Sequence, residues 1–212
     1  LLAPQAEVQP DCRMVLQDST LPKYPPTESL ARLTAQYAAS CHSGLICDFA
    51  QAPQSFFQAF LPMLEAACMD VGLPLWVPMA YGEYAPRSPV MVPSDCVEGN
   101  FHGSLEKAVA NRPQGCILEL RPLACRIVLP CLSEPQQLPH STLAAQIGQC
   151  SKTGFSDALC CRWGLLASDP VTVLLWDDRE TLEQKLTIAQ EAGFLAAVGL
   201  LQELGNHFLS HS

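Results

Sequence analysis

The side chains best placed for acid–base chemistry are three carboxylates. Asp48, Glu83 and Glu119 each stand at, or just beyond, the end of a run of apolar residues. A carboxylate at the end of a buried strand can donate or accept a proton during a reaction when its surroundings adjust its proton affinity. We therefore take these three residues as candidate catalytic groups.

Each carboxylate also has an explanation that involves no chemistry. Asp48 can cap a helix or close a loop through a hydrogen bond, as Asp often does. Glu119 can pair with Arg121 or Arg126, because buried charges are generally paired. Glu83 can simply be solvated in a loop. The residue types alone leave both explanations open.

Aromatic side chains near the same strand ends could stack against a ligand. Tyr81 and Tyr84 surround Glu83 and are the better candidates for a ligand-facing surface. Trp76 and Trp176 fall inside expected strands, which favours a place in the core. The predicted ligand-binding set is Asp48, Tyr81, Glu83 and Tyr84.

Apolar strands that alternate with amphipathic helices must position these residues. Such alternation indicates parallel strands covered on both faces. The pattern predicts an α/β fold with a parallel (β/α) barrel of the TIM type. The barrel is expected to be incomplete, with six to eight strands, because a full one takes about 250 residues. The expected strands are 11–18, 44–49, 73–81, 115–120, 125–131, 171–178 and 194–204, and the expected helices are 29–40, 55–72, 103–111, 141–150 and 179–193.

The chain organisation predicts one domain over residues 1–212, with residues 1–10 as an extended tail. An open doubly wound sheet is the structural alternative. However, no G-x-G-x-x-G or G-x-x-x-x-G-K-[ST] motif follows any expected strand, and no cofactor is predicted. The chain starts at Leu1 rather than methionine, so we expect that a preceding segment was removed.

Capping residues mark several expected helix ends. Ser55 is expected to cap the helix 55–72, and Gly72 is expected to end it. Asp177 stands three residues before Glu180, which is capping-box spacing. This spacing explains Asp177 without a role in a site.

Composition and charge exclude two classes of partner. Hydrophobic residues make up 49% of the chain and charged residues 16%, which is a globular composition. The formal net charge of -9 argues against nucleic-acid binding, which needs a surface rich in Lys and Arg. No apolar run reaches the roughly 18 residues that a membrane span requires.

The eleven cysteines do not form a zinc motif, because no C-x-x-C occurs, and no metal site is predicted. Several lie inside apolar segments, where a thiol behaves as a small hydrophobe. We interpret them as buried, reduced thiols. Disulfides in an oxidising compartment are the alternative.

Two segments resemble one known family. The stretch SGLICDFAQAP with the following helix, residues 44–75, is similar to the fourth strand and helix of glycoside hydrolase family 18, the chitinase-like barrels. The stretch 171–205 resembles the closing units of that family, where a W-x-D-D-like strand end precedes a helix with S-L-x-x-K; TLEQK, residues 181–185, takes that place. The resemblance implies a TIM-type barrel that acts on N-acetylated glycans.

The family signature D-x-x-D-x-D-x-E implies roles for residues in the first segment. Asp48 matches the aspartate that orients the substrate's acetamido group, whose oxygen is the internal nucleophile. Ala50 occupies the place of the glutamate that acts as general acid. The earlier signature aspartates fall on Ser43 and Ile46. The resemblance therefore implies a catalytic strand without its proton donor, and hydrolysis by the family mechanism is not expected.

Other departures concern the rest of the family site. The tryptophan of the closing strand would fall near residues 200–202, where none occurs. The M-x-Y-D tyrosine belongs two strands after the signature, whereas Tyr81 comes one strand after it. The first two family strands have no counterpart.

The favoured function is a catalytically defective, glycoside-hydrolase-like domain that binds N-acetylated oligosaccharides or peptidoglycan. One alternative is an active hydrolase that uses Glu83 or Glu119 as a displaced acid. Another is a structural or assembly protein without a glycan ligand, for which the proline-rich loop 81–101 could contact a protein partner. The resemblance favours the cell envelope or the extracellular space over the cytoplasm, although the cysteines fit a reducing compartment better.

Overall fold

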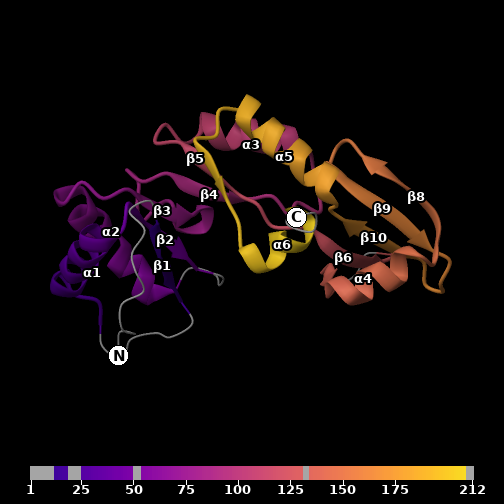
Figure 1. Cartoon of the computed structure of the whole chain (residues 1–212), viewed down its shortest axis with the longest axis horizontal. Coiled ribbons are helices and arrows are strands. Elements are labelled where there is room, and N and C mark those ends of the chain that lie inside the picture. The colour runs from indigo at the N-terminus through magenta and orange to yellow at the C-terminus, as the bar shows by residue number, and fades with distance from the viewer. Residues whose placement is uncertain (1–11, 19–24, 50–53, 131–133, 209–212) are drawn as a thin grey trace. The chain divides into compact units, whose positions relative to one another are not determined.

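The computed structural model describes residues 12–18, 25–49, 54–130 and 134–208 (Figure 1). The expected tail 1–10 lies outside these residues. The described chain contains two sheets, one parallel and one antiparallel, together with helices that connect or cover the strands.

The parallel sheet has six strands in the order β1-β2-β3-β4-β5-β11. This order follows the chain, whereas a doubly wound sheet reverses its order at a switch point. The prediction of an incomplete parallel (β/α) barrel is therefore confirmed, and the doubly wound alternative is wrong. The strands are β1 (Arg13–Gln17), β2 (Gly44–Asp48), β3 (Leu75–Pro78), β4 (Val90–Pro93), β5 (Cys116–Glu119) and β11 (Ala196–Val198).

Helices α1 (Glu28–Cys41) and α2 (Ser55–Asp70) follow the first two strands and pack against each other (Figure 1). Thr27 caps α1, because its side chain accepts a hydrogen bond from the Leu30 N–H. The residue at the cap position of α2 is Gln54 rather than Ser55, and its side chain makes no capping hydrogen bond. Gly72 follows α2 with φ of +67°, as expected of a glycine that ends a helix.

The second sheet is antiparallel, with strands in the order β7-β6-β10-β9-β8. The segments 125–131 and 171–178 were expected as parallel strands, but they form β6 and β10, which pair antiparallel with each other. The sequence reasoning missed the hairpin of β8 and β9. The strands of this sheet are β6 (Ala124–Val128), β7 (Gln136–Gln137), β8 (Cys150–Ser156), β9 (Cys161–Leu166) and β10 (Thr172–Trp176), and α4 (His140–Ile147) lies between β7 and β8 in the chain.

Two further expectations are corrected. The segment 81–101 is not a continuous loop, because it contains β4, whose residues Val90, Met91 and Val92 are buried. The segment 194–204 is not one strand, since β11 ends at Val198 and a helix follows. The remaining helices are η1 (Met79–Tyr81), α3 (Phe101–Ala110), α5 (Arg179–Glu191) and α6 (Leu201–Phe208).

The chain divides into two compact units. The first comprises residues 1–91 and 112–115, and the second comprises residues 92–111 and 116–212. Alanines of α1 and apolar residues of α2 and β2 fill the core of the first unit. The core of the second unit includes Leu123, Cys125, Cys161 and Leu175. That residues 1–212 act as one domain stays a prediction.

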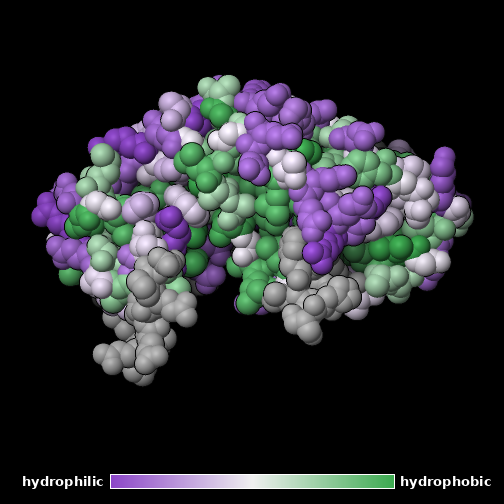
Figure 2. All heavy atoms as spheres, turned by 45° about the horizontal axis from the view of Figure 1, so that its top comes forward, coloured by the Kyte–Doolittle hydropathy of each residue, from purple (hydrophilic) through white to green (hydrophobic). Residues whose placement is uncertain are grey.

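The surface and the thiols complete the description. The face in Figure 2 shows hydrophobic areas between polar ones, and leucines near β11 are exposed, with Leu195 at 63% and Leu201 at 67%.

Within the described ranges, no helix combines the length and the apolar character that crossing a bilayer requires. Every cysteine in those ranges is a free thiol, and six of them are buried.

Candidate functional site

Asp48 lies at the carboxyl end of β2, half-buried. Its Oδ2 accepts a hydrogen bond of 3.1 Å from Nε2 of Gln17, the residue beside it at the end of β1. The Gln17 amide is neutral, so this hydrogen bond brings no positive charge to the Asp48 carboxylate. Ala50, the position of the missing acid, lies outside the described residues.

The aromatic residues after Asp48 form a packed cluster. Phe49 stacks on Phe57 with ring centroids 4.0 Å apart and meets Tyr81 edge-on at 5.1 Å. All three rings are buried, and the Tyr81 hydroxyl accepts a hydrogen bond of 3.2 Å from the Gln54 N–H. The expectation of a ligand-facing Tyr81 is corrected by this burial, because the ring belongs to the core.

Glu83 and Tyr84 lie in the turn after η1. Glu83 is exposed, and a hydrogen bond between the two side chains raises the pKa of the Tyr84 hydroxyl above its ordinary value. Tyr84 is partly exposed and packs edge-on against Tyr81, with centroids 6.4 Å apart. Of the two predicted ligand-facing tyrosines, Tyr84 is thus the one that reaches the surface.

Glu119 ends β5 and is paired with Arg121, whose Nε lies 2.8 Å from the Glu119 Oε1. The backbone N–H of Arg121 in turn donates to Oγ of Ser94, the residue that follows β4. An adjacent guanidinium favours an ionised carboxylate, whereas a general acid must hold its proton. The simpler explanation for Glu119, a charge pair with Arg121, is therefore the one that its contacts support.

Asp177 has a different role from the capping box that its spacing predicted. The cap of α5 is Asp178, which exchanges hydrogen bonds with Thr181. Asp177 is buried instead, and its Oδ2 accepts from Lys185 Nζ at 2.7 Å and from the Leu123 N–H at 2.8 Å. Lys185 is fully buried as well, so the pair is structural and out of reach of a substrate.

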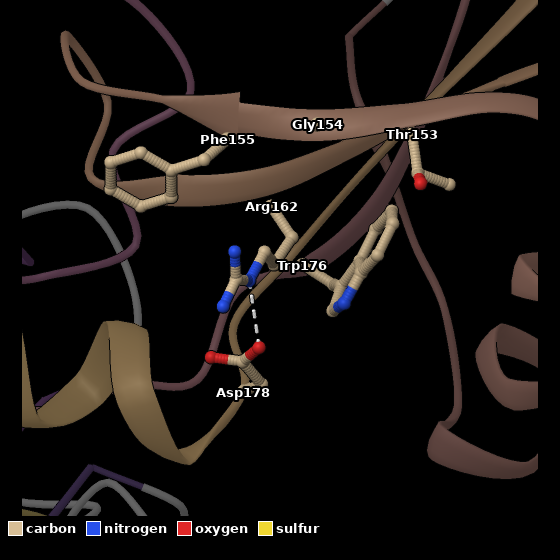
Figure 3. Close-up of a pocket in the computed structure, with 6 residues that line it drawn as sticks. All are labelled: Thr153, Gly154, Phe155, Arg162, Trp176 and Asp178. Atoms are coloured by element: carbon tan, nitrogen blue, oxygen red, sulfur yellow. Dashed lines mark hydrogen bonds and ion pairs between the residues drawn. The ribbon is translucent and has the colours of Figure 1, made fainter.

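A hollow on the antiparallel sheet is the site that sequence reasoning missed (Figure 3). Strand register aligns Phe155 of β8, Arg162 of β9 and Trp176 of β10 in one row across the sheet. We call it the Trp176 hollow; its volume is about 320 Å³, and it is lined by Thr153, Gly154, Phe155, Arg162, Trp176 and Asp178. The sequence gives little signal for it, because β9, with the sequence CRWGLL, does not alternate polar and apolar residues, and β8 and β9 were not recognised as strands.

Among the described residues, no group of three or more His, Cys, Asp or Glu side chains is arranged to hold a metal ion. The hollow itself contains one guanidinium and one carboxylate, which already bind each other.

The fold defines a class of protein: a parallel (β/α) barrel of reduced strand number, with an antiparallel sheet inserted between β5 and β11. Solved structures with this fold include glycosylases and chitinases. No protein-family model and no curated protein matches the sequence.

Three structures illustrate the likeness. YdhD of Bacillus subtilis, named as a sporulation-specific glycosylase, aligns with a TM-score of 0.58 at 12% identity, over 81% of this chain and 70% of that one. A chitinase from Chromobacterium violaceum aligns with 0.56 at 14% identity, over 90% and 75%. The spore cortex-lytic enzyme SleL of Bacillus megaterium aligns with 0.53 at 13% identity, and this chain spans 55% of its length.

Proposed function

We propose that this protein is a catalytically defective, glycoside hydrolase family 18-like domain that binds N-acetylated glycans of the chitin or peptidoglycan type. One observation carries the proposal: Asp48 keeps its place at the tip of β2, while Ala50 stands two residues later, where the family has its acid. A methyl group cannot donate a proton, and general acid catalysis contributes about 10²–10⁴-fold.

The fold likeness supports the glycan part of the proposal. The neighbours are named as glycosylases and chitinases, and two of them as spore cortex-lytic enzymes. At sequence identities of 10–14% this likeness supports the fold alone. That the ligand is an N-acetylated glycan is therefore our inference. By the same reasoning we place the protein in the cell envelope or outside the cell.

The position of the family tyrosine also supports loss of hydrolysis. That tyrosine belongs to the second strand after the signature strand, which is β4 in this fold. The sequence of β4, Val90–Pro93, contains no tyrosine, and Tyr81 lies after β3 in the core.

The displaced-acid alternative has less support. Glu119 is engaged by Arg121, and Glu83 is an exposed residue of a turn. Glu83 has no enclosed site around its carboxylate, and the Glu119 carboxylate is occupied by a guanidinium. Neither position therefore offers the enclosed, uncommitted carboxylate that we would expect of a displaced acid.

Two measurements on the same protein test the proposal. Calorimetric titration with the N-acetylglucosamine tetramer and with soluble peptidoglycan fragments is expected to detect binding, which Asp48→Ala weakens. A fluorogenic chitobioside is expected to show no turnover. Absence of binding at millimolar ligand would overturn the glycan part and favour a structural or assembly role.

Turnover would overturn the catalytic part. If the wild type hydrolyses the chitobioside and Glu119→Gln or Glu83→Gln abolishes that activity, the displaced-acid alternative is correct. Gln190→Ala, at an exposed position of α5, serves as the control variant for both measurements.

A further inference from the structure

We propose that the Trp176 hollow binds one neutral sugar residue, as a second contact for the glycan of the proposed function. The inference rests on that function and adds a location on the inserted sheet. It depends on the lining aromatic rings, the hydrogen-bonding groups between them and the local charge.

The aromatic part of the hollow comes from two rings of different strands. Figure 3 shows Phe155 and Trp176 on either side of the Arg162 guanidinium. A Cβ added at Gly164 would lie 3.2 Å from the Trp176 ring, so the indole lies closely over the backbone of β9. A flat, half-buried indole offers an apolar face on which the C–H face of a pyranose ring can pack.

A hydrogen-bond donor of Trp176 is unused. The comparable tryptophan on the other side of the sheet, Trp163, donates from Nε1 to the Phe155 carbonyl at 3.2 Å. Trp176 Nε1 donates to no protein group in the part of the chain that the structure describes. The Trp176 side chain is half-buried, and its Nε1 is not among the buried polar atoms that lack a partner in the described residues, so solvent reaches it and the N–H can donate to a ligand hydroxyl.

The polar part supplies both donors and acceptors. Arg162 Nε donates to Asp178 Oδ2 at 2.8 Å, and Arg162 Nη2 donates to Glu180 Oε2. The Asp178 carboxylate still has lone pairs that can accept, and the Arg162 guanidinium still has N–H groups that can donate. Both can therefore bind hydroxyl groups, which donate and accept hydrogen bonds. Thr153, exposed on β8, adds a further hydroxyl.

The charge of the hollow favours an uncharged ligand over an anion. Of its lining residues only Arg162 and Asp178 are charged, and they pair with each other, while Glu180, outside the lining, is a second carboxylate on Arg162. The lining therefore offers no unpaired positive charge to a phosphate or a carboxylate, whereas an uncharged polyol needs none. The volume of about 320 Å³ lies at the small end of the roughly 300–1,000 Å³ typical of ligand sites, which suits a single ring.

The neighbouring residues hold the hollow rigid. Asp178 is fixed by its capping exchange with Thr181, whose N–H lies 2.9 Å from Oδ1. Asp177, the preceding residue, is buried and bound to Lys185. A site that is already formed loses little conformational entropy when a ligand binds.

The test compares variants of the full chain by calorimetric titration with the N-acetylglucosamine tetramer. Trp176→Ala is expected to weaken binding about tenfold or more, as loss of a central aromatic contact commonly does. Thr153→Arg fills the hollow from an exposed position and is expected to weaken binding equally without removing a packed ring. Trp76→Phe and Gln190→Arg, at positions outside the hollow, are the matched controls and are expected to bind as the wild type does.

The outcomes separate this inference from the proposed function. Wild-type binding that both Trp176→Ala and Thr153→Arg weaken supports the inference. Wild-type binding that Thr153→Arg leaves unchanged overturns the inference and leaves the proposed function standing. A wild type that binds no glycan overturns the proposed function and this inference with it.

Discussion

Asp177 and Asp178 are adjacent and chemically identical, yet their surroundings give them opposite properties. Burial raises the pKa of Asp177 above its ordinary value, in spite of the Lys185 ammonium and the hydrogen bonds that stabilise its anion. For Asp178, partial burial acts in the same direction, but the Thr181 N–H and the Arg162 guanidinium outweigh it and lower the pKa. Asp177 is therefore part of the buried core, whereas Asp178 lines the surface hollow.

Glu65 allows a test at the level of a single residue. It is 3% exposed on α2 and accepts hydrogen bonds from the Arg87 N–H at 2.9 Å and from the Ser88 hydroxyl at 2.8 Å. These two donors share Oε1, and Oε2 accepts a third hydrogen bond from Arg87 Nε at 3.2 Å. Glu65→Gln keeps the shape but replaces one of the two oxygens with an NH2 group, so at least one donor loses its acceptor. We expect a loss of about 1.5–3 kcal/mol in the free energy of unfolding, the usual size for hydrogen bonds to charged groups.

Urea denaturation followed by circular dichroism measures this loss. The matched control is Glu83→Gln, the same change at an exposed turn, which should stay within about 0.5 kcal/mol of the wild type. Equal effects of the two substitutions would show that the buried hydrogen bonds contribute nothing specific.

At the level of elements, one buried ion pair joins several segments of the second unit. Lys185 extends from α5 and donates both to Asp177 at the end of β10 and to the carbonyl of Ser94 after β4. Asp177 also accepts from the Leu123 N–H ahead of β6. The position of α5 is thus fixed by contacts from strands of both sheets.

Removal of one partner should be costly, because it leaves the other charge buried and unpaired. We expect Asp177→Ala to lower the free energy of unfolding by about 3–5 kcal/mol. Asp178→Ala, the neighbouring change, should cost about 0.5–2 kcal/mol through loss of a helix cap. The double variant Asp177→Leu/Lys185→Met should recover most of the loss. Chemical denaturation of the wild type, the two single variants and the double variant measures these free energies of unfolding. Equal losses for Asp177→Ala and Asp178→Ala would contradict the role of the buried pair.

The sequence predicts the existence of most elements but not their partners. Apolar runs such as Thr172–Trp176 are correctly expected as strands, yet periodicity carries no information on whether a neighbour runs parallel or antiparallel. The strand β8 was missed because Ser151, Lys152 and Thr153 interrupt any apolar pattern, and β4 was missed because prolines flank its three apolar residues.

The candidate site was predictable to a similar degree. The place of Asp48 at a strand tip follows from an apolar run that stops at a carboxylate. The burial of Tyr81 does not, because it depends on Phe49 and Phe57 from two other elements. The capping box was assigned one residue too early, since Asp177–Glu180 and Asp178–Thr181 have the same spacing and side chains that can both cap.

At the level of the whole molecule, buried thiols make the fold sensitive to alkaline pH. Burial raises the pKa of Cys68 and Cys125 to about 11, raises that of Cys161 to about 12, and raises that of Cys47 further still, from an ordinary value of 9.0. Between pH 9 and about pH 11 the unfolded chain releases these protons while the folded chain retains them. The stability that these thiols contribute is therefore fully present below pH 9 and is lost as the pH rises through the folded values.

We expect the free energy of unfolding to fall with pH above 9, at up to about 1.4 kcal/mol per pH unit for each buried thiol. Urea denaturation under reducing conditions between pH 8 and about pH 10.5 measures this slope, with the range set by the thiol values. Cys161→Ala should make the slope shallower, because one proton fewer is released on unfolding. Cys12→Ala, at an exposed position, should leave the slope unchanged. A slope that is the same in all three proteins would mean that Cys161 ionises as readily in the folded chain as in the unfolded one, and that its place among Leu123, Cys125 and Leu175 is not the environment described.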